Sequence, residues 1–338
     1  MLTPESIVLI GVALAFAWSM GAHYTGATMG MSYASHSIKE WPALVIMGIL
    51  ALLGATIASH AVELNLGKNV IPFSSVTVTL AIVIVGCGFL LTTVLTYVKI
   101  PSSTIQILVF AVVGSALASG LAVNWRLIGS FVAVWAMAPL VACGLGYVLT
   151  HLMDIVLPKC MARRDAMGNQ VAGTTAIGAG TIVARILVLF GAVASFTMGA
   201  NDVSNASGVF LMTNLFGVLA AGFVGGIGLA IGALTWGRPL LHRVAFDIVK
   251  LDLNMASAAQ FAQALVVFVP VITFGYFTSM NQALVGAMAG AGLARGRQTV
   301  QKKTVVGILE GWAVGPLSSL ALAFVIVKVI EIIAPTLA

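Results

Sequence analysis

One carboxylate lies inside a stretch of the chain that is otherwise uncharged and rich in small residues. Residues 199–208 read Gly-Ala-Asn-Asp-Val-Ser-Asn-Ala-Ser-Gly. An ionisable residue this deep in an apolar segment is costly, so a functional role is the default hypothesis for it. Its carboxylate could bind sodium together with neighbouring amide oxygens, or it could carry a proton. The predicted coupling-ion residues are Asp202, Asn201, Asn205 and Ser207.

Two polar turns have the residues to bind an anion. Residues 102–104 (Ser-Ser-Thr, tip 1) follow a proline where a helix would begin, and residues 278–281 (Thr-Ser-Met-Asn, tip 2) stand in a similar context. Free N–H groups at a helix N-terminus, with added hydroxyls, can hold an oxyanion without a fixed cation. The alternative is that these residues only cap helices. The predicted anion-binding residues are Ser102, Ser103, Thr104, Thr278, Ser279, Asn281, Gln106, Gln282, Thr25 and Thr28.

Four titratable residues have open roles. By register between the halves, Tyr24 stands where Asp202 stands, so one half has lost its carboxylate. His23 could titrate near neutral pH or be a hydrogen-bonded structural group. Lys99 either reaches toward the anion or anchors a helix end, and Glu310 either carries a proton or pairs with nearby lysines. The sequence holds no nucleophile–base set, zinc pattern or phosphate-binding loop, which predicts no enzyme, no cofactor and no metal beyond possible sodium.

The composition requires lipid around most of the chain. Of 338 residues, 60% are hydrophobic and only 8% are charged, whereas a soluble domain carries about 25% charged residues. The net charge of +6 falls in short loops, where it reports topology and not nucleic-acid binding. A span needs about 20 residues, and the stretches 104–122 and 281–294 each follow a tip, which makes both candidates for re-entrant hairpins. The apolar stretches are 4–35, 42–60, 74–97, 104–122, 127–152, 181–213, 214–236, 256–278, 281–294 and 304–335.

The two halves of the chain repeat each other. The Gly-Ala pair at 21–22 recurs at 199–200, a spacing of 178 (199−21), and the Trp-x-x-x-Pro element at 135–139 recurs at 312–316, a spacing of 177 (312−135). Basic loops predict that the N-terminus lies outside, so the two repeats start on opposite sides. The predicted fold is an all-α polytopic membrane protein. It has two inverted-topology repeats of about five hydrophobic segments each, discontinuous helices and two re-entrant hairpins.

The predicted division of the chain follows from the repeat. Repeat 1 covers residues 1–152, a basic cytoplasmic linker covers 153–180, and repeat 2 covers 181–338. Inverted repeats are typical of secondary transporters, whose substrate binds near the midplane where the repeats meet.

At these residues the chain resembles the inorganic phosphate transporter (PiT) family. The family's Gly-Ala-Asn-Asp-x-x-Asn-Ala-x-Gly motif is matched in full at 199–208, and its hairpin tip and Trp-x-x-x-Pro elements are similar to residues 101–104, 135–139 and 312–316. The degenerate first motif, with Tyr24 and Ala27, and the compact length are similar to the family's sulfate permease branch. The resemblance also implies a homodimer.

We therefore predict a secondary active transporter, multi-pass in the cell membrane. It would import a tetrahedral inorganic oxyanion, with sulfate favoured, by alternating access coupled to a proton or to sodium. A phosphate:cation symporter of the same fold is the first alternative, and a passive anion channel is the second. The expected partners are sulfate or phosphate and the lipid bilayer, with no nucleic acid.

Overall fold

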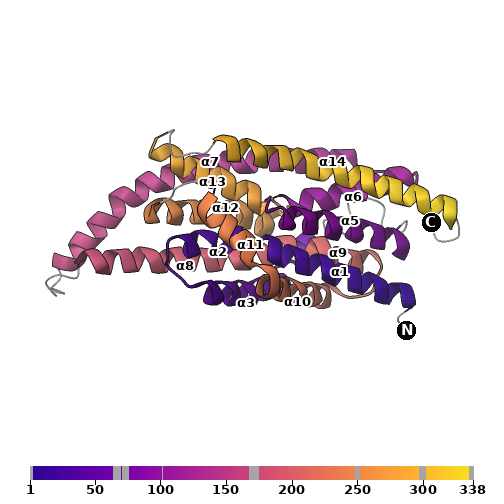
Figure 1. Ribbon diagram of the computed structural model, residues 1–338, viewed down its shortest axis with the longest axis horizontal. Coiled ribbons are helices and arrows are strands. Elements are labelled where there is room, and N and C mark those ends of the chain that lie inside the picture. The colour runs from indigo at the N-terminus through magenta and orange to yellow at the C-terminus, as the bar shows by residue number, and fades with distance from the viewer. Residues whose placement is uncertain are drawn as a thin grey trace.

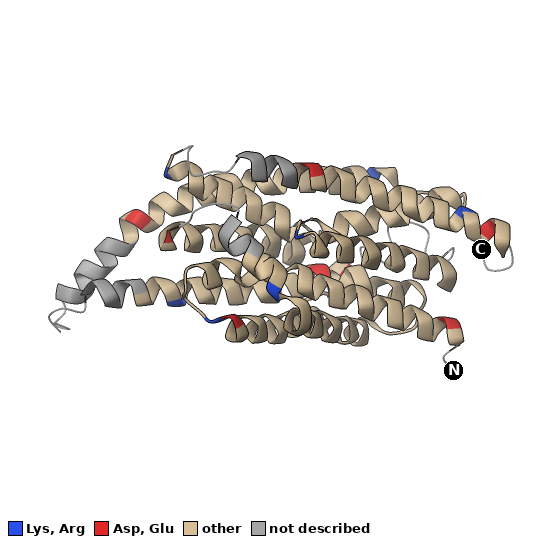
Figure 2. Ribbon diagram, viewed as in Figure 1, with Lys and Arg blue, Asp and Glu red and all other residues tan. Residues whose placement is uncertain are grey.

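The structure, a computed structural model, describes residues 3–63, 70, 76–100, 102–166, 175–247, 252–296 and 302–334, without the side chains of helical residues 157–166, 175–180, 243–247 and 302–308. Every regular element in these residues is a helix. Eight helical segments are long and apolar enough to cross a membrane, which confirms the prediction of a multi-pass α-helical membrane protein. Figure 2 shows how few charged residues interrupt these helices.

The helices follow the order of the predicted segments. The first half holds α1 (Pro4–His23), α2 (Thr25–Ala34), α3 (Glu40–Ala58), α5 (Val78–Tyr97), α6 (Thr104–Ala118) and α7 (Trp125–Ala166). The second half holds α8 (Thr175–Asp202), α9 (Ser204–Met212), α10 (Val218–Trp236), α11 (Arg238–Asp247), α12 (Leu253–Phe274), α13 (Met280–Ala294) and α14 (Lys302–Ile333). The short helix α11 was not among the predicted segments.

Two long helices are interrupted at nearly matching places. The break between α1 and α2 is Tyr24 and the break between α8 and α9 is Val203, one residue away from the 178-residue register (203−24 = 179). Each interruption is a single residue, because the Thr28 N–H still donates to the Tyr24 carbonyl and the Ser207 N–H to the Val203 carbonyl. The helix axis therefore continues in both halves. The backbone departs from regular helix at Tyr24 (φ −96°, ψ 0°), whereas Val203 keeps helical angles (φ −58°, ψ −36°).

The two helices that follow the tips are short. Helices α6 and α13 have 15 residues each, about 22 Å at the rise of an α-helix, against a hydrocarbon core of about 30 Å. Ser103 caps α6 by accepting from the Gln106 N–H at 3.4 Å, and Ser279 caps α13 by accepting from the Gln282 N–H at 3.3 Å. The side chain at each tip thus defines where its helix begins.

The predicted linker is helical at both of its ends. Helix α7 continues to Ala166 and α8 begins at Thr175, and residues 167–174 lie outside the described part of the chain. Figure 1 shows α7 and α8 extending past the other helices at one end of the molecule, while both chain termini lie at the opposite end.

Helices of one half pack against helices of the other in reciprocal pairs. Helix α1 packs on α10 and α3 on α8, while α6 packs on α14 and α13 on α7. At Gly21 an added Cβ would overlap the carbonyl oxygen of Leu229, and at Gly199 it would overlap that of Ala51. The two glycines are 178 residues apart (199−21), and so are the two residues that they face (229−51). Equivalent residues therefore make equivalent close contacts in the two halves.

Candidate functional site

A buried polar group surrounds the interruption of α8. It consists of Tyr24, Thr104, Asp202 and Asn205, all fully buried, and is called the Asp202 group below. The Thr104 hydroxyl lies 2.8 Å from the Tyr24 hydroxyl and accepts from Asn205 Nδ2 at 3.0 Å. The Asp202 carboxylate lies beside the hydroxyls of Tyr24 and Thr104. The structure therefore joins tip 1 directly to the predicted coupling-ion residues.

Asn201 joins tip 2 to the same group. Its Oδ1 accepts from the Thr278 N–H at 2.9 Å, and its Nδ2 lies 2.7 Å from the Thr278 carbonyl and 3.0 Å from Asp202 Oδ2. The tips also contact each other, because Asn281 Nδ2 donates to the Ser102 carbonyl at 2.6 Å. Both tips and the acidic motif thus form one buried site.

Several oxygen atoms at this site have no hydrogen-bond partner in the described structure. They belong to Asp202 (Oδ1), Asn205 (Oδ1), Asn281 (Oδ1) and Thr278 (Oγ1). Buried polar atoms are nearly always paired, so each one needs an explanation. Carboxylate and amide oxygens are the ligands that hard cations prefer. The free oxygens of Asp202 and Asn205 therefore fit a sodium ion, and the carboxylate alone could take a proton.

Asp202 is the one formally charged residue in the two tips and the Asp202 group. The structure does not bring Lys99 or Glu310 to them, since both side chains are exposed; the lysines proposed as partners for Glu310 have no described side chains. An anion at the tips would therefore meet neutral donors and one acid, with no fixed cation.

Three predicted residues lie apart from the site. The Thr25 hydroxyl donates to the Gly237 carbonyl at 2.5 Å, and the Thr28 hydroxyl donates to the Tyr24 carbonyl at 3.1 Å. Ser207 lies 2.6 Å from a carboxylate oxygen of Glu63 and 2.9 Å from the Val203 carbonyl. The structure therefore does not place these hydroxyls with the tips or with Asp202.

Glu63 is a buried acid that the sequence reasoning missed. It is fully buried, its Oε1 meets Ser207, and its Oε2 has no partner in the described structure. Burial raises its pKa from 4.5 to about 7, against the opposing effect of the Ser207 and Ser59 hydroxyls. Glu63 follows the predicted 42–60 span in what reads as a loop. The available signal was Ser59 four residues earlier, because residues at that spacing share a helix face.

Gln106 and Gln282 pair with each other. Each amide nitrogen lies 3.2 Å from the other residue's amide oxygen, so the pair is reciprocal. They line a cavity of about 440 Å³ together with Trp135 and Trp312, the matched tryptophans of the two halves. The glutamines therefore join α6 to α13 close behind the two tips.

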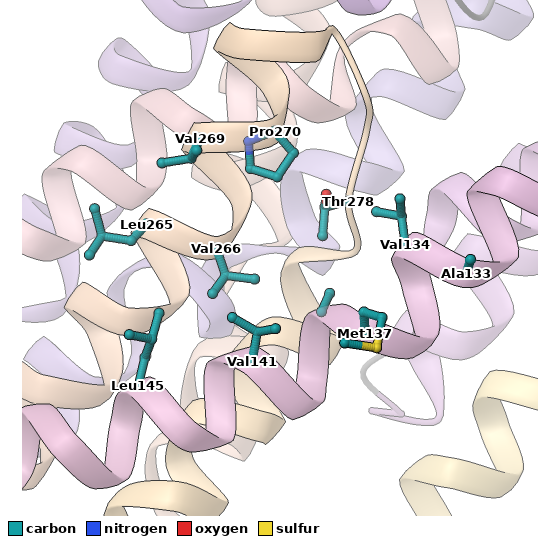
Figure 3. A pocket seen from close by; sticks show the side chains of 11 residues that line it. Ala133, Val134, Met137, Val141, Leu145, Leu265, Val266, Val269, Pro270 and Thr278 are labelled. Carbon is teal, nitrogen blue, oxygen red and sulfur yellow. The ribbon is translucent and has the colours of Figure 1, made fainter.

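A second cavity lies beside tip 2. It has a volume of about 560 Å³ between α7 and α12, and Thr278 is its one polar lining residue (Figure 3). Met137 and Val269 at its wall are 54% and 47% exposed. An oxyanion needs several donors, so this apolar cavity is not an anion site.

The fold and the site together define a class: a multi-pass helical membrane protein with a buried polar site reached by two helix N-termini, an acid and hard oxygen ligands. Comparison with known proteins agrees. The model of the phosphate transporter family matches residues 20–323, and the chain belongs to this family, which consists of transporters and not enzymes. The resemblance inferred from residues 199–208 is thereby confirmed.

Several relatives extend over almost the whole chain. The sulfate permease CysP of Bacillus subtilis is 27% identical over 94% of this chain and 85% of its own length. A protein of Methanocaldococcus jannaschii, provisionally named a phosphate permease, is 25% identical over 98% of this chain and 100% of its own. A solved structure titled as the sodium-dependent phosphate transporter has a TM-score of 0.85 at 20% identity, covering 98% of this chain and 100% of that one, and shows the shared fold.

Proposed function

We propose that this protein is a secondary transporter that carries a tetrahedral oxyanion, with sulfate favoured, together with a cation. The observation that carries this proposal is the union of tip 1, tip 2 and Asp202 in one buried site without a fixed cation. The donors for the anion would be the tip hydroxyls and the N-termini of α6 and α13.

The coupling follows from charge. A dianion placed beside the Asp202 carboxylate would be repelled strongly in a site of low dielectric. Sodium bound at Asp202 and Asn205, or a proton on Asp202, removes this repulsion, because either one neutralises the carboxylate. Each ligand then raises the affinity of the site for the other, and such mutual stabilisation is reciprocal by necessity. Transport of one ligand down its gradient can therefore drive the other.

Alternating access would come from two inverted repeats. The reciprocal helix pairs, the one-residue interruptions at nearly equivalent positions and the equivalent glycine crossings support this arrangement. The short helices α6 and α13 would be the inner arms of two re-entrant hairpins, whose tips meet near the midplane. The N-terminus would lie outside, with the 153–180 segment in the cytoplasm.

Sulfate is favoured because the site has a single carboxylate. Tyr24 and Ala27 stand where the second half has Asp202 and Asn205 (202−24 = 178 and 205−27 = 178). The likeness to a sulfate permease supports the same choice. Phosphate is the second candidate. The Asn281 Oδ1, which has no partner in the described structure, could accept a hydrogen bond from a P–OH group, and sulfate has no such group. A passive channel is the third.

Uptake into proteoliposomes tests this proposal. Purified protein would be reconstituted, and labelled sulfate uptake would be measured under an imposed proton gradient and, separately, an imposed sodium gradient, with phosphate as competitor. We expect concentrative sulfate uptake with one gradient and its loss in Asp202→Asn. Uptake of phosphate alone would favour the second candidate, and anion flux without accumulation would favour a channel.

A further inference from the structure

His23 and Asn201 occupy equivalent positions in the two halves, at a spacing of 178 (201−23). Each contacts the first residue of a tip: His23 contacts Ser102 and Asn201 contacts Thr278, at a spacing of 176 (278−102). The two side chains differ in kind but touch the same backbone group, because each accepts a hydrogen bond from the N–H of its tip residue. Both residues are fully buried.

The hydrogen bonds fix the protonation of His23. The Ser102 N–H is always a donor and lies 3.1 Å from His23 Nε2, whereas the Ser102 carbonyl oxygen lies 3.3 Å from the same nitrogen. The shorter contact assigns Nε2 as the unprotonated acceptor. The other nitrogen, Nδ1, then carries the proton and donates to the Thr96 hydroxyl at 2.8 Å. Thr96 in turn donates to the Thr92 carbonyl at 2.7 Å. The chain of donors is consistent from end to end with a neutral imidazole.

A histidine can satisfy only half of what an asparagine satisfies. Asn201 pairs with both the N–H and the carbonyl of Thr278, at 2.9 and 2.7 Å. In this tautomer His23 has no donor for the Ser102 carbonyl, although that oxygen lies 3.3 Å from Nε2. The Ser102 carbonyl is taken instead by Asn281 Nδ2, at 2.6 Å, from tip 2. Tip 1 is thus held by two residues where tip 2 is held by one.

We infer that His23 is a positioning residue that, with Asn281, clamps tip 1 as Asn201 clamps tip 2, and that only its neutral imidazole can accept the hydrogen bond from the Ser102 N–H. A protonated His23 would lose the hydrogen bond from the Ser102 N–H, and its Nε2–H would compete with Asn281 for the Ser102 carbonyl, 3.3 Å away. The Ser102 N–H would then have no acceptor, and the clamp on tip 1 would loosen. One of the two clamps therefore responds to acid and the other does not. This inference rests on the proposed function, because it treats the tips as the anion site.

In the described part of the chain, no acidic or basic side chain forms a hydrogen bond with the His23 imidazole. Tyr24 lies edge-on to it with ring centroids 5.6 Å apart, and Asp202 lies beyond Thr104 in the Asp202 group. Two of the helices that pack on α1, namely α9 and α10, have no Asp, Glu, Lys, Arg or His. A third, α5, ends in the exposed Tyr97. On α11, Arg238 and His242 contact Glu40 instead.

Amide hydrogen exchange at tip 1 tests the clamp without any need for transport. Exchange would be followed by mass spectrometry in wild type, His23→Asn and His23→Leu, near neutral pH and under acid. We expect His23→Leu to raise tip 1 exchange at least tenfold, while His23→Asn stays protected at both pH values. Wild type should lose protection only in acid. Tip 2 is the internal control and should be unchanged in all three.

Uptake measurements test whether His23→Asn compensates for the loss of Asn281. Asn281→Ala should lower the initial rate of sulfate uptake at least fivefold, and His23→Asn should restore much of it in the double variant, because the new asparagine can supply the missing donor. Equal tip 1 exchange in wild type and His23→Leu would overturn the clamp, as would an unprotected His23→Asn. If the exchange results hold and no anion is carried, the clamp stands and the proposed function fails.

Discussion

Glu63 gives a prediction with a definite size. Its pKa is raised from 4.5 to about 7 by burial, so the folded protein resists ionising this group. An acid whose pKa is raised on folding contributes stability that is present below its unfolded pKa and is lost as the pH rises through the folded pKa. The wild type should therefore lose about 3 kcal/mol of stability between about pH 4.5 and 7 through this one group.

The variant Glu63→Gln removes this titration and retains a side chain of similar size that can still bond Ser207. Thermal unfolding of the purified protein in detergent, followed by tryptophan fluorescence across this pH range, measures the effect. The difference between the variant and wild type should grow in favour of the variant as the pH rises toward 7, and then level off. Glu310→Gln, at an exposed carboxylate, is the matched control and should retain the wild-type pH dependence. Parallel curves for wild type and Glu63→Gln would refute the reasoning.

Three more predictions concern packing, a cap and an ion pair. Gly199→Ala should lower stability by about 2 kcal/mol or more, because the Cβ would overlap the Ala51 carbonyl, whereas Gly11→Ala has open space and should gain up to about 1 kcal/mol; thermal unfolding separates the two, and equal effects would contradict the close crossing. Ser279→Ala should cost about 1 kcal/mol by removing the α13 cap and should weaken anion binding, which titration of purified protein measures; unchanged stability would dismiss the cap. Arg295 forms ion pairs with Asp154 and Asp252, and these carboxylates raise its pKa. The substitution Arg295→Gln should lower the free energy of unfolding by about 1 kcal/mol at low salt and by less at high salt. A loss of stability that does not depend on salt would point to packing instead.

The parts of the site that could be predicted from sequence are those with a high physical cost. A carboxylate in an apolar segment is rare enough to single out Asp202, and the repeat register then identifies Tyr24 as its counterpart. Ser103 and Ser279 are recognisable because a hydroxyl at the start of a helix has one common role, the cap. The membrane spans follow from length and hydrophobicity.

The rest depends on contacts that no local pattern encodes. Thr25, Thr28 and Ser207 are hydroxyls in the glycine-rich stretches 21–30 and 199–208. A hydroxyl in a helix bonds a backbone carbonyl as readily as it binds a ligand, and these three do so in the structure. The bond from Asn281 to Ser102 joins residues 179 apart in sequence. Glu63 lies in a segment that reads as a loop, so its burial was visible only in three dimensions.

The central claim is that a cation at Asp202 enables the anion to bind between the tips. Titration of sulfate into the purified protein, at a series of proton and sodium concentrations, measures this most directly. We predict that the sulfate affinity of the wild type rises with one of the two cations. In Asp202→Asn, whose side chain is already neutral, the affinity should no longer depend on that cation. Cation-dependent sulfate binding that persists unchanged in Asp202→Asn would contradict the account.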